Sequence, residues 1–179
     1  MASAVFEVCE RYVTGQAALD PVWGTMRGVA GAAGVSTDYG PEGISARADL
    51  ARATLAELDA VSPDRAGGAR SGRDEAAARF LRGRLLAELA AVEIGEPLRA
   101  VRAPFGLLAT VRDSIDLMPK DGADDWAAVA ARMAAIPWML ASWRDALALG
   151  LDRGLPAARQ QAVEAALQAD RYADCHTHT

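Results

Sequence analysis

Four aspartates, a proline and a glycine lie within the segment DLMPKDGADDW, residues 116–126. Carboxylates at this density could bind a hard cation or act as a general acid–base pair. A calcium loop of the EF-hand type needs acids at alternate positions and a distal glutamate, and Asp121, Asp124 and Asp125 lack that spacing. A catalytic pair needs two carboxylates at a set separation in a pocket. The segment therefore offers acidic groups without a recognisable ligand pattern.

A simpler interpretation makes this segment a corner between two helices. Pro119 is expected to end the first helix, and Asp121 to cap a second helix that begins near Ala123. Asp124 and Asp125 would lie in the first turn, where each meets the positive end of the helix dipole, an interaction worth roughly 0.3–1 kcal/mol. We therefore favour capping over chemistry. Four apolar side chains of the second helix are expected to face the core: Trp126, Val129, Met133 and Ile136.

The last residues of the chain, ADCHTHT, hold both histidines and one of the two cysteines. Cys175, His176 and His178 are candidate metal ligands, and DCHTHT resembles the first-strand motif of PHP phosphoesterases, in which both histidines bind metal. Further ligands would be needed, and Asp170 and Asp174 are the nearest candidates. We predict no metal site in this chain and interpret residues 175–179 as a disordered or non-native tail.

Other patterns typical of catalysis or cofactor binding are missing from the sequence. None of the serines has a G-x-S-x-G setting, and Cys9 lies on an apolar helix face, where a small core residue is expected. The glycine-rich segment 28–43 lacks both G-x-G-x-x-G order and a GK[ST] ending. We predict no catalytic and no cofactor-binding residue. The four tryptophans are expected to pack in the core.

Composition narrows the class of protein. The net charge of -5 argues against a nucleic-acid partner, because phosphate binding favours a basic face. Two cysteines far apart do not make a disulfide framework, and the N-terminus does not resemble a signal peptide, so we expect a cytoplasmic protein. No stretch approaches the ~20 apolar residues that span a membrane, so we expect no membrane partner.

Apolar residues recur at helical spacing along most of the chain, whereas no segment alternates as a strand would. We predict an all-α fold, an antiparallel bundle or layer of about seven to eight helices without a substantial sheet, in a single domain over residues 1–174. The predicted helices cover residues 3–18, a short stretch from Pro21, 41–61, 73–94, 107–117, 123–136, 138–149 and 156–172.

The segment SIDLMPKDGADDWAAVAARMAAIPWML also carries a family resemblance. It contains an Asp-Leu-Met-Pro run, an acid pair followed by tryptophan, then an arginine and a proline. Segments 19–21, 37–44 and 150–167 keep a matching order around it. Together they resemble a bacterial family known as domain of unknown function eight-eight-five, whose members are similar to gluzincin zinc metallopeptidases. The motif residues are Asp116, Pro119, Asp121, Asp124, Asp125, Trp126, Arg132 and Pro137.

The resemblance implies zinc-dependent hydrolysis for full-length members, whose histidine-glutamate zinc motif lies downstream of this segment. That motif is not found here, so we expect a non-catalytic N-terminal helical portion without zinc of its own. It would shape one wall of a substrate cleft. Its expected partner is the zinc-bearing C-terminal part or a second copy of the chain, bound through an exposed apolar face. The alternatives are a free-standing helical domain that binds a ligand or partner, and a small metalloenzyme using the C-terminal Cys/His cluster.

Overall fold

The computed structural model describes residues 3–29, 36–61 and 72–174. Within these ranges every regular element is helical, and no strand is present, which confirms the predicted all-α class. The elements are α1 (Ala4–Leu19), α2 (Pro21–Met26), α3 (Pro41–Ala60), α5 (Gly72–Glu93), the 3-10 helix η1 (Glu96–Arg99), α6 (Leu107–Asp116), α7 (Ala123–Asp152) and α8 (Arg159–Asp174).

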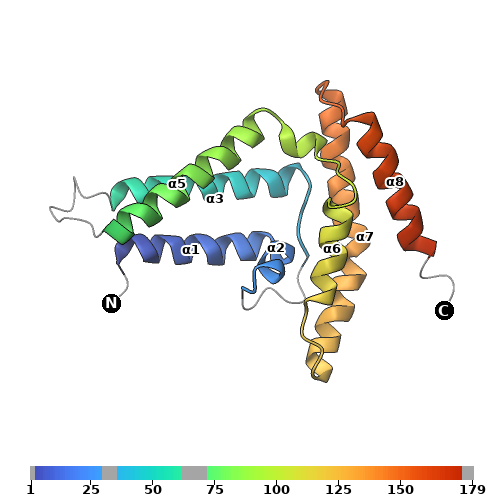
Figure 1. Ribbon diagram of the computed structural model, residues 1–179, viewed down its shortest axis with the longest axis horizontal. Helices are drawn as coiled ribbons and strands as arrows, with labels where there is room; N and C mark the ends of the chain where they lie inside the picture. The colour runs from blue at the N-terminus through green and yellow to red at the C-terminus, as the bar shows by residue number, and fades with distance from the viewer. Residues whose placement is uncertain (1–2, 30–35, 62–71, 175–179) are drawn as a thin grey trace.

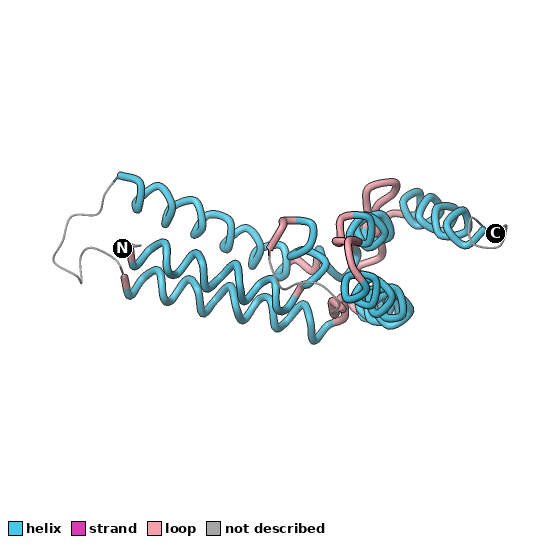
Figure 2. Tube along the Cα trace, turned by 90° about the horizontal axis from the view of Figure 1, so that it is seen from below, coloured by secondary structure: helices cyan, strands magenta, loops and turns pink. Residues whose placement is uncertain are grey.

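The helices form two groups that meet near the middle of the molecule. Helices α1, α3 and α5 lie side by side, with α3 running back against the other two (Figure 1). Helices α6 and α7 run across one end of this group, and α8 lies on their far side (Figure 2). The predicted antiparallel arrangement therefore holds within the first group, while α2 and η1 connect it to the second.

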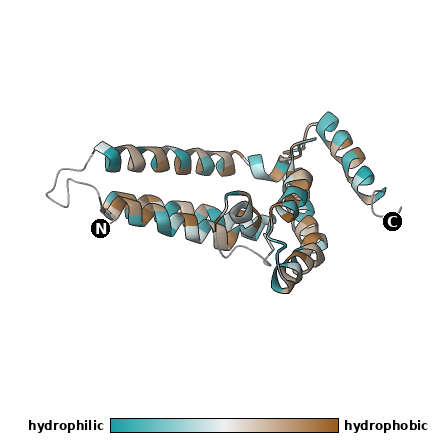
Figure 3. Ribbon diagram, turned by 60° about the horizontal axis from the view of Figure 1, so that its bottom comes forward, coloured by the Kyte–Doolittle hydropathy of each residue, from teal (hydrophilic) through white to brown (hydrophobic). Residues whose placement is uncertain are grey.

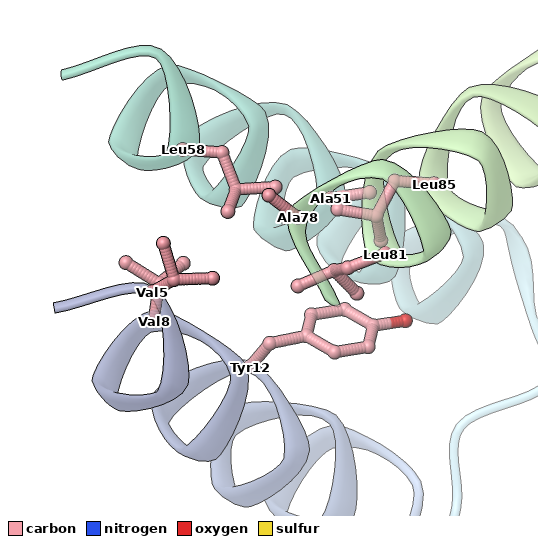
Figure 4. Close-up of a cluster of buried hydrophobic side chains, with 8 residues drawn as sticks. All are labelled: Val5, Val8, Tyr12, Ala51, Leu58, Ala78, Leu81 and Leu85. Carbon is pink, nitrogen blue, oxygen red and sulfur yellow. The ribbon is translucent and has the colours of Figure 1, made fainter. Parts of the chain in front are cut away.

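The core of the first group is made by apolar side chains that repeat at helical spacing on three helices. Figure 4 shows these side chains pointing into the space between α1, α3 and α5. Val8, Leu58 and Leu85 have no exposed surface. Fully burying a side chain of this size is worth about 1.5–3 kcal/mol, so this cluster is the main source of cohesion in the group. Its buried members are Val5, Val8, Tyr12, Ala51, Leu58, Ala78, Leu81 and Leu85.

A smaller cluster joins α2, α6 and α7. Val22, Val111 and Met139 are buried together there. Hydrophobic residues run along the ribbons of both helix groups, so both contribute apolar surface to the interior (Figure 3). The amide of Tyr39 donates to Ser142 Oγ at 3.0 Å, which ties the segment before α3 to α7.

Helices α1 and α2 each begin just after a residue whose side chain caps the first turn, Ser3 and Asp20. Asp20 caps α2 as predicted: its Oδ1 accepts from the amide of Trp23 at 2.9 Å, and Pro21 occupies the first helical position. The predicted start of the last helix at residue 156 is wrong, since α8 begins at Arg159. The chain needs residues 153–158 to turn back after α7, and Gly154 takes a left-handed conformation (φ +72°) in that turn.

The prediction of two helices separated by Pro137 is wrong, because α7 continues without a break from Ala123 to Asp152. Pro137 removes the backbone donor that would reach the carbonyl of Met133, but its ring lies on the exposed side. Val129 before it and Met139 after it are both buried. Ile136 and Met139, on either side of Pro137, belong to the same apolar cluster, so a break between them would disrupt that cluster.

The predicted inward face of α7 is confirmed for two of its four residues and wrong for the other two. Ile136 packs against the apolar cluster around Met139. Val129 is buried, but Trp126 and Met133 are 54% and 46% exposed. The buried stripe instead passes through Val129, Arg132 and Met139, which recur at helical spacing. Because this helix has apolar residues on all sides, the sequence did not indicate which side is buried.

The tryptophans do not pack the core as expected. Trp138 is 51% exposed and Trp126 is similar, while Trp23 and Trp143 are half-buried. None of the helices in the described ranges is both long and apolar enough to cross a membrane. The predicted C-terminal tail, with Cys175, His176 and His178, lies outside the described residues.

Candidate functional site

The acidic corner at residues 116–126 is a helix junction, although its capping differs from the prediction. Asp121 is not the cap, because the N-cap position belongs to Gly122. The carboxylate of Asp125, three residues on, turns back instead: its Oδ2 accepts from the amides of Asp121 at 3.0 Å and Gly122 at 3.1 Å. Asp124 is exposed in the first turn, near the positive end of the helix dipole, as expected.

Lys120, the only lysine of the chain, closes the other side of this corner. Its Nζ donates to the carbonyls of Ile115, Asp116 and Met118 at 3.0, 2.9 and 3.2 Å. These carbonyls lie at or just beyond the end of α6, where a cation also meets the negative end of the helix dipole. The sequence analysis missed this role. A basic residue just past a helix end was the available signal.

The carboxylates of the corner do not gather into a cluster in the part of the chain that the structure describes. There, no group of three or more histidine, cysteine, aspartate or glutamate side chains gathers closely enough to hold a metal ion. Asp116 and Pro119 are exposed at the end of α6 and in the turn that follows it. The carboxylates of the corner thus serve backbone groups and solvent.

Arg132 is the one motif residue that the fold buries completely. Its side chain enters the interior from α7 with no exposed surface. One terminal nitrogen lies 3.4 Å from Ser114 Oγ of α6, and the other lies 3.3 Å from Thr25 Oγ1 of α2. Burial lowers the pKa of this guanidinium, and the neighbouring Tyr39 and Asp20 oppose that shift. Arg132 thus connects three helices through polar contacts.

A second set of buried polar groups lies beside Arg132. The hydroxyl of Thr37 donates to Asp20 Oδ1 at 2.8 Å and accepts from the amide of Val22 at 3.1 Å. Burial raises the pKa of the Tyr39 hydroxyl, and the charge of Asp20 raises it further, against the opposing effects of Thr37, Arg47 and Arg132. Tyr39 therefore stays protonated at neutral pH. Each of these groups already interacts with a neighbouring one, so the set has a structural role. We call it the structural lock.

An open hollow of about 370 Å³ lies next to this lock, where the two helix groups meet. Arg47 of α3 and Trp143 of α7 stand on different elements of its wall. Phe105, which is 89% exposed, stands at its mouth. Its lining residues are Tyr39, Ile44, Arg47, Glu96, Pro97, Ala100, Arg102, Phe105, Gly106, Leu107, Thr110 and Trp143. The lining thus combines aromatic, aliphatic and charged groups.

A second hollow of about 250 Å³ adjoins the first, and four residues line both: Ile44, Arg47, Glu96 and Pro97. This second hollow also borders three carboxylates, those of Asp20, Glu88 and Glu96. The balance of charge thus differs between the hollows: acidic groups dominate the second, while guanidinium groups outnumber the single carboxylate in the first.

None of the eight motif residues from the sequence analysis lines either hollow. The structure places those residues at the corner, within α7 and in the polar contacts below the hollow. The lining residues come from segments far apart in the chain, so no local spacing could have revealed them. Arg47 in particular resembled an ordinary polar position on a packed helix.

Comparison with known proteins identifies one matching family. The family model described as "Bacterial protein of unknown function (DUF885)" matches residues 21–179. That match covers every lining residue of the first hollow, from Tyr39 to Trp143, as well as the whole acidic corner. No curated protein matches the chain.

Proposed function

The chain belongs to the bacterial family of unknown function DUF885, and within that family we propose that it forms the non-catalytic helical part of a zinc metallopeptidase-like protein. The metallopeptidase element rests on the resemblance of the 114–140 segment and its flanking motifs. The described residues do not fit a zinc site, because no three suitable ligands come together among them. We therefore assign no hydrolytic step to this chain. We propose instead that it binds a partner and shapes one wall of a cleft, in a protein of the bacterial cytoplasm.

The outward face of α7 is the observation that carries this proposal. Residues 126–143 include a single charged side chain, Arg132, and that one points inward. A helix that is apolar all round is normally buried on all sides, because exposing such a surface forfeits about 25 cal/mol for each Å². Here one side remains open. The exposed residues of this face are Trp126, Ala127, Ala130, Ala131, Met133, Ala134, Pro137 and Trp138.

We propose that the metal-bearing part of the protein covers this α7 face. Two large aromatic rings, Trp126 and Trp138, would then be desolvated at the contact, as is typical of residues that dominate interface energetics. The hollow beside Arg47 opens at the junction of the helix groups, so it would form one wall of a cleft. A zinc-bound water from the covering part would supply the hydrolytic chemistry.

Reconstitution tests the proposal. The chain is mixed with a separately produced family polypeptide that carries the zinc motif, and complex formation and peptide hydrolysis are measured. We expect a complex, and zinc-dependent hydrolysis that exceeds that of either component. Trp138→Gln should weaken the complex at least tenfold. Phe80→Gln is the matched control, since Phe80 is 78% exposed on α5, away from the α7 face. No complex, or equal effects of both variants, would contradict the proposal.

A second candidate function is a free-standing helical domain that binds a ligand or a second copy of itself. The open hollow between the helix groups favours it. Sedimentation and dye binding of the chain alone distinguish self-association from an uncovered interface. A symmetric dimer that does not bind a hydrophobic dye supports self-association through the α7 face. A monomer that binds the dye strongly supports an uncovered interface.

A third candidate, a small metalloenzyme that uses Cys175, His176 and His178, has no support among the described residues. Metal analysis of the protein with and without its last five residues tests it. Stoichiometric metal that disappears with the tail would favour this candidate over the other two.

A further inference from the structure

We propose that the hollow beside Arg47 binds a carboxylate group attached to a flat apolar group, with the guanidinium of Arg47 receiving the carboxylate. The inference goes beyond the proposed function, because it concerns a ligand site made by this chain alone. It would stand even if the α7 face had no partner, and it rests on the charges, the support and the lining of the hollow.

The charge of the hollow favours an anion. Arg47 and Arg102 bring two positive charges, and Glu96 brings one negative charge. The terminal nitrogen of Arg102 and Oε1 of Glu96 are 2.7 Å apart, so these two largely neutralise each other. Arg47 has no carboxylate within 4.0 Å among the described residues. In a chain whose net charge is -5, this hollow has a local excess of positive charge.

Most N–H donors of the Arg47 guanidinium make no hydrogen bond to a described residue. A guanidinium offers five N–H groups and binds a carboxylate through two of them in parallel. The bond that Arg47 makes among the described residues runs from Nη1 to the carbonyl oxygen of Asp38, at 2.7 Å. That bond orients the planar group, and the remaining N–H groups make no hydrogen bond to a described residue. Because Arg47 is half-buried, a charge-assisted bond there is less weakened by solvent than one on the open surface.

The support under Arg47 is rigid. Asp38 Oδ1 accepts from the amide of Gly40 at 2.7 Å, and Tyr39 is tied to Ser142 of α7 through its own amide. The start of α3 packs so closely on this turn that a Cβ on Gly43 would lie 2.1 Å from the carbonyl oxygen of Asp38. The acceptor that orients Arg47 is therefore held from three sides, which lowers the ordering cost of binding.

The remaining lining suits a flat apolar group. Tyr39, Trp143 and Phe105 bring aromatic surfaces from three separate segments, and aliphatic side chains fill the space between them. Aromatic rings prefer offset or edge-to-face contact with other rings, which an open wall of this kind allows. A volume of about 370 Å³ falls in the lower part of the range of small-ligand sites, about 300–1,000 Å³. One carboxylate with one ring fits that size.

Such a ligand could be a free aromatic acid or the C-terminal residue of a peptide, and separate titrations distinguish these sources. Backbone amide shifts of the isotope-labelled chain are followed by NMR during addition of phenylacetate, N-acetyl-phenylalanine or a hexapeptide ending in phenylalanine. The C-terminal amides of the last two ligands are the uncharged controls. We expect millimolar binding of the acids, shifts around Arg47 and Trp143, and at least tenfold weaker binding of the amides. Tighter binding of the hexapeptide would identify peptide ends as the source.

Two variants assign the contacts. Arg47→Gln should weaken acid binding about tenfold and leave amide binding unchanged, whereas Arg52→Gln, five residues along the same helix, should change neither. Phe105→Ala should weaken the binding of both acids and amides. Phe105 is 89% exposed, so it contributes almost nothing to the fold. If Arg47→Gln lost its folded spectrum, Phe105→Ala and the comparison of acids with amides would still test whether the hollow binds a carboxylate. Equal affinity for acids and amides, or no binding of either, would overturn the proposal.

Discussion

The guanidinium of Arg132 reaches the interior from the middle of α7, where two hydroxyl groups lie 3.3 and 3.4 Å from its terminal nitrogens. A buried cation is costly unless its surroundings compensate for lost hydration. Ser114 and Thr25 supply part of that compensation, and the charge of Asp20 acts in the same direction. At the scale of the residue, Arg132 is a structural connector rather than a reactive group.

Replacing Arg132 tests this role. Arg132→Ala should lower the free energy of unfolding by about 2–4 kcal/mol, because it leaves a cavity in the interior and removes the polar contacts to Ser114 and Thr25. Arg132→Met, which keeps much of the volume and needs no polar partner, should lose less. Urea denaturation of the two variants measures the difference. A cost below about 0.5 kcal/mol for the alanine variant would show that Arg132 does not support the fold.

Tyr12 provides a prediction for alkaline pH. Burial, aided by the charge of Glu88 and the hydrogen bond to it at 3.1 Å, raises the pKa of Tyr12 to about 12. Because the folded pKa lies above the ordinary value of 10, the stabilisation is complete below pH 10 and is lost as pH rises towards 12. Tyr12→Phe should therefore flatten the fall in stability over that window. Thermal unfolding between pH 8 and pH 12 measures it, and parallel curves for the two proteins would contradict it.

The long helix α7 shows how an element is set by neighbours as well as by its own residues. Its N-terminus depends on the carboxylate of Asp125, which accepts from two backbone amides, while Asp124 next to it meets only the helix dipole. Both were predicted to lie in the first turn. Only the structure distinguishes their roles, since a shift of one residue in the cap exchanges them.

These two aspartates form a matched pair for measurement. Asp125→Ala should lower the free energy of unfolding by about 1 kcal/mol, because two amides lose their acceptor. Asp124→Ala should cost a few tenths of a kcal/mol, the size of an exposed dipole interaction, so roughly a third as much. Denaturation midpoints at low ionic strength compare them. Equal costs would mean that Asp125 acts through its charge alone.

The whole molecule depends on contacts between its two helix groups. The amide of Tyr39 is bound to Ser142, and Val22 of α2 packs with Val111 and Met139 of the second group. Small domains with such shared cores usually unfold in a single cooperative step. The hollow depends on this arrangement, because its lining residues come from both groups.

Cooperativity gives a prediction at this scale. Leu58→Ala in the first group and Met139→Ala in the second each remove a side chain with no exposed surface, at a cost of about 2–5 kcal/mol. Each variant should shift the unfolding of the entire chain, so that far-ultraviolet circular dichroism and tryptophan fluorescence give coincident transitions. Fluorescence reports mainly on the second group, where three of the four tryptophans lie. Two separate transitions would show that the groups fold independently.

The amino-acid sequence alone was enough to predict the helical class and most helix boundaries. Those features depend on periodicity and on caps only a few residues away, such as Asp20 before Pro21. The acidic corner was also recognised as a junction for that reason. Local chemistry acts over a turn or two of helix, and the printed order of residues contains that information directly.

Only the tertiary structure decided the continuity of α7 through Pro137, the burial of Arg132 and the outward position of Trp126. It alone brought Arg47 and Trp143 to one hollow, although nearly a hundred residues separate them in the chain. The physical reason is that α7 is apolar on every side, so its periodicity does not choose which side is covered. Packing against α3, η1 and α6 makes that choice, and no spacing within the chain encodes those distances.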